Sequence, residues 1–319
     1  AKTGNESSFR GFDVENIQYS VREFTCEACS NCCDIQEFTV EGEKTYWGDK
    51  CSDRFRKQTK SEKKPLIEDL FDFRALKLEQ DWLQVFASGD YGGDLQFIAE
   101  KARNNLTWQA GVSHRFGMMR SMYFYHRHPF WKTYLELLGG ELVVTGPTTK
   151  TTVHRGIDDS VAEPCFPIQV AHGHLRELTK QQVDFVIVPA HINDVTDDPN
   201  VQSHVFPFGH AMPFLLKHSP ASSGQSAKIK TPMVHFRQGH GFVEKELWTQ
   251  LGKDFVRRHQ HRLAVTLAFA AQQMIQREIL KAGSDALKNI NDTVESGIEL
   301  IGRPYNIKDP GLNLNLAAK

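Results

Sequence analysis

The stretch FGMMRSMYFYHRHPFWKTYLELLGGELVVTG, residues 116–146, decides the fold. It begins within GVSHRFGMM, 111–119, which has the pattern of a strand, and the apolar spacing of the following residues predicts a helix. Gly139 and Gly140 end this helix, because glycine tolerates the left-handed conformation found at helix C-termini. ELVVTG, 141–146, then has the pattern of a second strand. The order strand, helix, strand is typical of an α/β domain.

The next segments continue the alternation. CFPIQVAHGHLRELTKQQV, 165–183, begins as a loop and continues as a helix, and DFVIVPA, 184–190, is a short, apolar strand. Such strands, separated by helices, predict a parallel sheet covered on both faces, a Rossmann-like domain. Ligands of such sheets bind at the carboxyl ends of the strands. We therefore expect Cys165, His191 and the loop up to Pro213 at that edge.

Outward from this core, the sequence predicts five parts. They are a cysteine-rich metal- or cluster-binding region with a hairpin (1–65), a helical linker (66–110), the α/β domain (111–218), a long helical segment (219–298) and the start of a second α/β unit (299–319). ELIG, 299–302, is the predicted first strand of that last unit. Because the chain ends soon after this unit begins, we expect it to be a piece of a longer polypeptide.

Composition restricts the function classes. Hydrophobic residues make up 40% and charged residues 24%, as in soluble globular proteins. A formal net charge of -1 predicts no bulk attraction to nucleic acid or to an anionic membrane. No apolar run approaches the roughly 20 residues of a membrane helix, and the N-terminus lacks an apolar signal core. We expect a cytoplasmic protein, in which clustered cysteines serve metal or redox chemistry rather than structural disulfides.

Five of the six cysteines lie between Cys26 and Cys51. FTCEACSNCCDI, 24–35, is followed by a segment with strand-like alternation (EFTVEGEKTYW, 37–47) and by GDKC, 48–51. Thiolates on short loops closed by a hairpin can converge on one metal ion or cluster. Zinc usually takes paired C-x2-C knuckles, whereas an iron–sulfur cluster often takes C-x2-C-x2-C with a remote cysteine. The spacing leaves both open, with Cys26, Cys29, Cys51 and either Cys32 or Cys33 as ligands.

Several motifs in this order resemble one family. Residues 116–146, EPCFPIQVAHGHLREL (163–178) and DFVIVPA are similar to the uncharacterised domain fused to activators of 2-hydroxyacyl-CoA dehydratases. CEACSNCC followed by GDKC resembles the cysteine motif just upstream of that domain, and GRPYNIKDPGLN resembles the start of the next α/β unit. The resemblance implies an upstream ATPase domain of the actin-like and sugar-kinase-like class in the same polypeptide. It also implies kinship with dehydratase components and double-cubane-cluster reductases, which use oxygen-sensitive iron–sulfur clusters under anaerobic conditions.

The resemblance also implies site residues. The family's first motif, C-x-x-C-x-N-x-C, selects Cys26, Cys29, Cys33 and, from the second piece, Cys51 as metal ligands, so it favours Cys33 over Cys32. The second motif carries over to a set that we expect near a bound cofactor: Glu163, Cys165, Pro167, His172, Gly173 and His174. The implied cofactor is a [4Fe-4S]-type cluster, with zinc as the alternative.

Two features weigh against a second cluster in the α/β domain. Where relatives tend to have Cys-Pro, this chain has Phe206-Pro207, and phenylalanine cannot bind iron. Either His204 or His210 substitutes, the ligands come from elsewhere in the polypeptide, or this cluster is absent, and a buried structural thiol is then the alternative role for Cys165. His172 and His174 are two residues apart, which on a helix points them to different faces. Capping or hydrogen bonding at the start of the helix is the structural alternative for both.

Three functions follow. The first is an iron–sulfur or metal-binding electron-transfer module of an ATP-dependent low-potential reductase or 2-hydroxyacyl-CoA dehydratase activator. The second is a zinc-stapled, non-catalytic module that binds a protein partner or an acyl-CoA. A self-contained hydrolase or transferase has no motif in its favour, so no catalytic residue is assigned. We also expect a homo-oligomer.

Overall fold

The computed structural model describes residues 17–28, 32–49, 67–88, 100, 113–198, 200–293, 299–314 and 316. Two compact units make up the chain: residues 1–62 with 314–319, and residues 63–313. Helices and parallel strands form the larger unit, and antiparallel strands form the smaller one.

The smaller unit is a three-stranded antiparallel sheet. Its strands β1 (Tyr19–Thr25), β2 (Asp34–Val40) and β3 (Glu43–Trp47) lie in the order β1-β2-β3. The turn between β2 and β3 consists of Glu41 and Gly42, with φ of 50° and 85°. Two left-handed residues match the twist of a two-residue hairpin.

The larger unit contains the predicted parallel sheet. Strands β4 (His114–Met118), β5 (Gly140–Val144), β6 (Phe185–Ile187) and β8 (Ile229–Lys230) pair in parallel in the order β5-β4-β6-β8. Beyond Pro189 and Pro232 the chain continues into β7 (Ala190–Asn193) and β9 (Met233–His235), which form a second parallel pair. The sheet that the sequence predicts is therefore present, with a small extension at its carboxyl edge.

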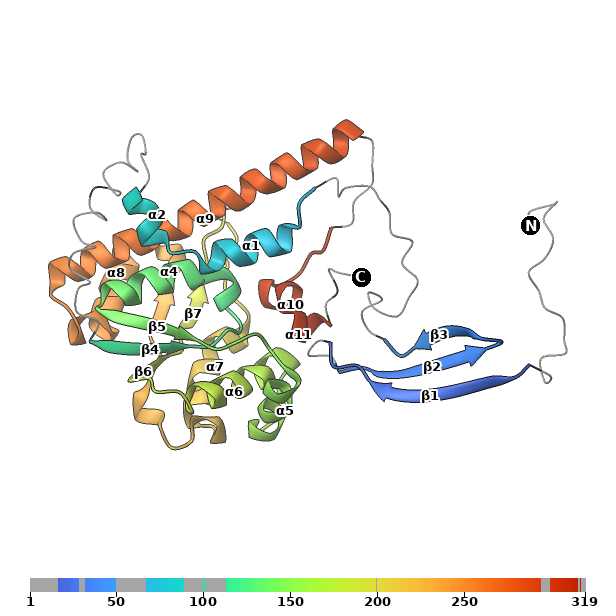
Figure 1. Ribbon diagram of the computed structural model, residues 1–319. Coiled ribbons are helices and arrows are strands. Elements are labelled where there is room, and N and C mark those ends of the chain that lie inside the picture. The colour runs from blue at the N-terminus through green and yellow to red at the C-terminus, as the bar shows by residue number, and fades with distance from the viewer. Residues whose placement is uncertain are drawn as a thin grey trace. The chain divides into compact units, whose positions relative to one another are not determined.

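Helices cover both faces of this sheet (Figure 1). They are α1 (Leu70–Glu79), α2 (Trp82–Ser88), α4 (Phe124–Leu137), α5 (Lys150–Asp159), α6 (Phe166–Leu178), α7 (Pro207–His218), α8 (His240–Gln250), α9 (Arg258–Thr293), α10 (Pro304–Lys308) and α11 (Pro310–Asn313). Short 3-10 turns span Pro220–Ser222, Ser226–Lys228, Phe236–Gln238 and Gly252–Asp254. Among the described residues, no helix combines the length and the apolar character needed to cross a membrane.

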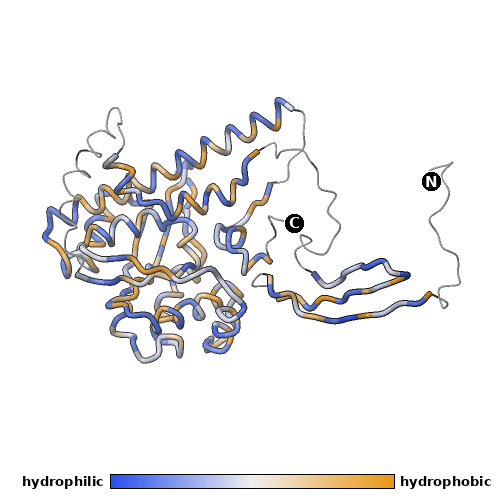
Figure 2. The backbone as a smooth tube through the Cα atoms, in the orientation of Figure 1, coloured by the Kyte–Doolittle hydropathy of each residue, from blue (hydrophilic) through white to orange (hydrophobic). Residues whose placement is uncertain are grey.

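The sheet separates two hydrophobic cores. Neighbouring residues of β6 point to opposite faces: Val186 packs in a cluster with Leu175 of α6, and Ile187 in a cluster with Trp131 of α4. A strand that is buried on both faces is apolar at consecutive positions, which explains the uninterrupted run in DFVIVPA. Figure 2 shows hydrophobic and hydrophilic segments alternating along α9, which packs by its buried side on the α4 core.

The glycine pair after α4 has two separate roles. Gly139 adopts a φ of 88°, so it ends the helix in the left-handed conformation as predicted. Gly140 is instead the first residue of β5, where an added Cβ would collide with the ring of Phe116.

The C-terminal segment of the larger unit differs from the prediction. Residues 299–302 form no strand, so the strand predicted for ELIG is wrong. The two short helices α10 and α11 follow instead. Tyr305 and Asp309 on this segment are 3% and 1% exposed, and Tyr305 packs in the same core cluster as α6 and α7. Burial of these side chains anchors the segment to the larger unit.

Helices α5 and α6 cross at two glycines. An added Cβ on Gly173 would collide with the carbonyl oxygen of Thr152, and one on Gly156 would collide with that of Gln169. Glycine is therefore required for this close approach of two backbones.

We expect Gly173→Ala to destabilise the chain by about 1–3 kcal/mol, because the added methyl group forces the two helices apart. Gly283→Ala in α9 is the matched control: nothing lies within 4 Å of the added Cβ, so the better helix propensity should stabilise the chain by up to about 1 kcal/mol. Urea unfolding of both variants measures the difference. Equal midpoints for the two variants would contradict the close packing.

Candidate functional site

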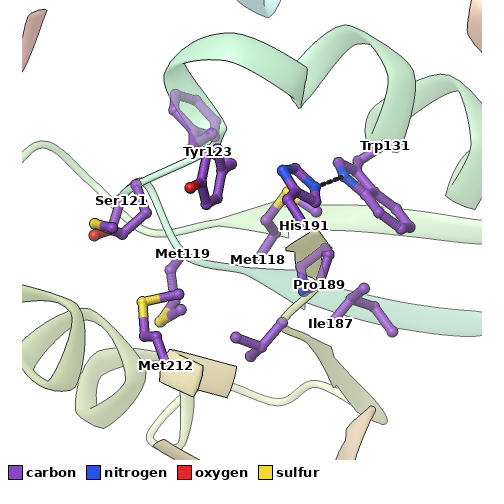
Figure 3. Close-up of a pocket in the computed structure, with 12 residues that line it drawn as sticks. Met118, Met119, Ser121, Tyr123, Trp131, Ile187, Pro189, His191 and Met212 are labelled. Atoms are coloured by element: carbon purple, nitrogen blue, oxygen red, sulfur yellow. Dashed lines mark hydrogen bonds between the residues drawn. The ribbon is translucent and has the colours of Figure 1, made fainter. Parts of the chain in front are cut away.

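A pocket lies where β4 and β6 end, at the edge where the fold places ligands (Figure 3). Its volume is about 30 Å³, so as it stands it admits a water-sized group rather than a whole cofactor. Four methionines contribute to the wall, and methionine is the most adaptable of the apolar side chains. The lining residues are Met118, Met119, Ser121, Met122, Tyr123, Phe124, Trp131, Ile187, Val188, Pro189, His191 and Met212.

His191 is the central polar group of this pocket. It is 2% exposed, and its ring lies between Tyr123, at 4.5 Å between ring centroids, and Trp131 (Figure 3). The indole N–H of Trp131 donates to Nε2 of His191 at 3.1 Å, so the imidazole carries its proton on Nδ1. Burial and the nearby Arg127 hold the pKa of His191 well below 6.5. The imidazole is therefore neutral and fixed in one tautomer.

An ion pair forms at Arg127, which lies one helical turn from both Tyr123 and Trp131. Arg127 is 3% exposed and donates from Nη2 to Oδ1 of Asp194, just after β7. His126 contacts the other carboxylate oxygen, with Nε2 3.1 Å from Oδ2. Desolvation and the charge of Arg127 lower the pKa of His126 to about 3, so its imidazole is neutral and donates Nε2–H to the carboxylate. Asp194 thus holds two residues of α4 in place.

A second polar chain links α6 to the C-terminal segment. Thr148 donates to Oδ2 of Asp309 at 2.6 Å, so its hydroxyl oxygen accepts from Nε2–H of His174 at 3.0 Å. Nδ1 of His174 then accepts from the Thr145 hydroxyl at 2.8 Å. Burial lowers the pKa of His174 to about 4 and raises that of Asp309, which also receives hydrogen bonds from Tyr125 and Gly311. Both nitrogens of His174 are therefore satisfied within the protein.

The structure separates the residues expected near a cofactor. Glu163 and Cys165 are exposed, and Cys165 caps the start of α6, so the alternative of a buried structural thiol is wrong. His172 and His174 lie inside α6 and are 4% and 0% exposed, so they do not cap the helix start. Nδ1–H of His172 donates to the carbonyl oxygen of Ile168 at 2.8 Å.

Phe206 caps the start of α7 much as Cys165 caps α6, each with a proline in the first turn. The guanidinium of Arg303 stacks on the Phe206 ring at 3.9 Å, a favourable cation–π contact. Of the two histidines considered as substitutes, His210 donates Nε2–H to the carbonyl oxygen of Ile192 at 2.8 Å. An aromatic ring and an arginine therefore occupy the place where a second cysteine was expected.

The smaller unit brings two of the expected metal ligands together. The backbone N–H of Cys26 donates to the carbonyl oxygen of Cys33 at 2.8 Å, and the two side chains share a buried cluster with Ile35. Cys29 and Cys51 lie outside the described residues. Among the residues that are described, no three histidine, cysteine or acidic side chains converge as a metal site.

Comparison with known proteins identifies the larger unit. The family model described as CoA enzyme activase uncharacterised domain (DUF2229) matches residues 115–319. The chain belongs to this family. No curated protein and no solved structure matches the chain. The family match begins at β4 and therefore includes the pocket, the Asp194 ion pair and the His174 chain.

Sequence reasoning missed Arg127, Trp131, Asp194 and Asp309. Two signals could have indicated Arg127 and Asp194, whereas no local pattern marks Trp131 or Asp309. A charged HRH triplet interrupts the aromatic run of 121–131, and Asn193-Asp194 directly follows an apolar strand. Charged residues inside apolar runs are almost never buried without a partner, so such positions indicate a buried pair.

We expect Thr148→Val to destabilise the chain by about 1–3 kcal/mol, because Asp309 Oδ2 and His174 Nε2 each lose a buried hydrogen bond. The segment that Asp309 anchors should also become more sensitive to trypsin at Lys308. Thr151→Val, at an exposed position of α5, is the control and should change stability by less than about 0.5 kcal/mol. Equal unfolding midpoints for both variants would exclude the anchoring role.

Four histidines with strongly lowered pKa values should make the chain acid-labile. The pKa values of His126 and His128 are lowered to about 3 and that of His174 to about 4, mainly by burial, and that of His191 is lowered well below 6.5. The unfolded chain therefore binds more protons than the folded chain below about pH 6.5, and stability falls as pH falls. With these four groups, the loss is about 5 kcal/mol per pH unit between about pH 6 and 5.

Urea unfolding at pH 7.5, 6.5 and 5.5 measures this loss. His128→Phe should reduce the slope by about one quarter, since it removes one of these four titrating groups. Nδ1 of His128 has no hydrogen-bond partner, and its ring already lies 4.4 Å from that of Phe124. His154→Gln, at an exposed position, should leave the slope unchanged. Stability that stays constant down to pH 5.5 would refute the prediction.

Proposed function

We propose that this chain is a metal-binding module of a CoA-enzyme activation system. The metal centre is held by Cys26, Cys29, Cys33 and Cys51, and an iron–sulfur cluster is the cofactor that we favour. Membership of the CoA enzyme activase domain family supports the activation role. The observation that carries the metal site is the meeting of Cys26 and Cys33 in one buried cluster, 7% and 5% exposed.

The strand register supports Cys29 and Cys51 as the other two ligands. Cys29 lies within the short connection between Cys26 and Cys33. The register of β2 and β3 pairs Gln36 with Trp47, so the chain leaves β3 beside the start of β2, next to Cys33. Gly48 has a φ of 97°, and an added Cβ there would collide with the carbonyl oxygen of Asp34. Cys51 is two residues after Asp49 in the sequence, and two residues span at most about 7 Å.

The burial pattern also supports Cys33 over Cys32 as the ligand. Cys33 shares the buried cluster with Cys26, whereas Cys32 is half-buried with a φ of 39°. Cys33 is therefore the one of the two adjacent cysteines that we place at the same centre as Cys26.

A structural zinc is the second candidate, and the size of the small sheet favours it. Only Cys26, Cys33 and Ile35 are buried in its described core, with Phe24 and Tyr46 partly buried against them. Small sheets bury too little apolar surface to offset the entropy of folding, and natural ones add a metal or a disulfide. In the zinc proposal, the hairpin holds a protein partner in position, and the α/β domain provides the surface that binds this partner.

When bound, an iron–sulfur cluster supplies one-electron transfer, and zinc supplies a rigid crosslink. The residues of this chain provide the thiolates, exclude water from two of them and fix the distance between the strands that carry them. We further propose that the upstream actin-like or sugar-kinase-like ATPase domain expected from the resemblance is the partner whose ATP hydrolysis the module serves.

The test is the metal content of anaerobically purified protein, with iron, sulfide and zinc measured together. We expect stoichiometric iron and sulfide, lost by at least half in Cys33→Ser because the centre then lacks one of its four thiolates. Cys32→Ser is the matched control one residue away and should retain the metal, as should Cys165→Ser.

If the protein contains zinc but no iron, the structural-zinc proposal replaces the iron–sulfur proposal. A chain that binds neither metal, or that keeps its metal in both Cys26→Ser and Cys33→Ser, would refute the site.

A further inference from the structure

One face of the three-stranded sheet is apolar and open to solvent. Side chains alternate along each strand, so the register places one apolar set on the same side: Tyr19, Val21, Phe38, Val40 and Trp47. Tyr19, Val21 and Trp47 are 68%, 45% and 66% exposed, and the other two are half-buried. We call this side the open face. Its exposed tyrosine and tryptophan are residue types that are enriched where proteins bind one another.

The opposite face of the same sheet is already occupied. It carries the buried cluster of Cys26, Cys33 and Ile35. It also carries the ion pair of Lys44 with Glu37, at 2.9 Å. The open face is therefore distinct from the side on which the cysteines lie.

The charged residues of the open face are all acidic. Gln36 donates from Nε2 to Glu23 at 2.9 Å, and Thr25 donates to Asp34 at 3.1 Å, so these side chains lie together across β1 and β2. Glu43 begins β3 on the same side. Within the three described strands, the open face carries no lysine or arginine. Two open faces would bring like charges together, so the surface that fits is apolar and basic.

The far half of α9 carries an apolar side of its own. Leu280 and Leu287 are 72% and 64% exposed. They are about two helical turns apart in sequence, so they lie on one side of the helix, which we call the leucine face. Ala271, by contrast, packs in the α4 core about half a turn round the helix. The leucine face thus points away from the core of the larger unit.

Basic residues flank the leucine face. Arg277, Lys281 and Lys288 are exposed and lie about a quarter of a turn from the line of the two leucines. Glu278 lies on the other side of the helix, where it pairs with Lys77 of α1 at 2.6 Å. The leucine face therefore complements the open face in charge as well as in apolar character.

The two faces also match in size. The seven-residue strands β1 and β2 are about 23 Å long, and the stretch of α9 from residue 277 to 288 spans about 18 Å. Three strands about 4.8 Å apart present about 300 Å² on one side. One contact of this size is small for a stable complex. Two such contacts bury about 1,200 Å² from both partners, which is within the range of specific interfaces.

We propose that the open face binds the leucine face of α9 in a second copy of this chain. Each copy carries both faces, so two copies close a symmetric dimer with two identical contacts. In each contact the leucines of one copy pack on the aromatic side chains of the other. The basic flank of α9 meets the carboxylates of Glu23, Asp34 and Glu43.

Sedimentation equilibrium of the full chain measures this assembly. We expect a dimer with a Kd of about 10 µM or tighter, weakened by salt because the paired charges are exposed. Glu23→Lys combined with Glu43→Lys should raise the Kd at least about tenfold, because both contacts then bring like charges together. Asp158→Lys, at an exposed position of α5, is the control and should leave the Kd unchanged.

Reversal of the charges on α9 tests the partner surface. Arg277→Glu combined with Lys288→Glu should weaken the dimer by a similar factor, and all four substitutions together should restore it. Two further substitutions would not restore a chain that had failed to fold, so the restoration is decisive even if one pair of substitutions disturbs the fold.

A chain that stays monomeric at about 100 µM would overturn the proposal, and the open face would then be left to a different partner. A dimer that neither pair of charge reversals weakens, or that the four substitutions together do not restore, would also overturn it. Metal content is measured separately and depends on the opposite face of the sheet, so either result would leave the metal-site proposal standing.

Discussion

In the larger unit, the polar contacts around α4 depend on a backbone hydrogen bond that Pro129 cannot donate. Inside α4 this residue has no N–H to offer the carbonyl oxygen of Tyr125, four residues earlier. Arg74 of α1 approaches that oxygen instead, at 3.4 Å, and Gln272 of α9 bonds to the next carbonyl, that of His126. The same turn carries Arg127. The missing donor thus leaves an acceptor for α1, and the neighbouring carbonyl oxygen in the same turn accepts a hydrogen bond from α9.

Buried polar groups in this unit are held neutral or paired rather than left charged. Arg127 has Asp194, and Asp309 has three hydrogen-bond donors around it. The histidines are neutral because burial lowers their pKa values, and each hydrogen bond then fixes the tautomer. The polar chains therefore specify which helix meets which strand, and the apolar cores supply the driving force. These hydrogen-bonded side chains fix the helices and strands relative to one another. Because they are engaged in that role, few of them are available for catalysis.

Periodicity in the sequence predicted the parallel sheet and its helices, because runs such as DFVIVPA have no other stable environment than a doubly covered strand. It failed for ELIG, whose apolar residues resemble a strand but whose following segment is anchored by Asp309 through Thr148. That contact joins residues 161 positions apart, which no local pattern encodes. The pairing of Arg127 with Asp194 was missed for the same reason. The sequence pointed to the cysteines as candidate ligands because thiol ligands cluster in sequence. It did not identify the metal.

Phe206 stands where relatives tend to have a cysteine, so its surroundings bear on which residues of the chain bind a metal. A ligand at the start of α7 would have faced the same edge of the sheet as Cys165, and two helix N-termini there would have favoured an anionic cluster. Phenylalanine instead provides a face for Arg303, which adds a positive charge where a second thiolate was expected. His174 has both nitrogens engaged, and His191 and His210 each have one engaged. Within the described part of the α/β domain, Cys165 is thus the only thiol, and Phe206 with Arg303 takes the place of a second one.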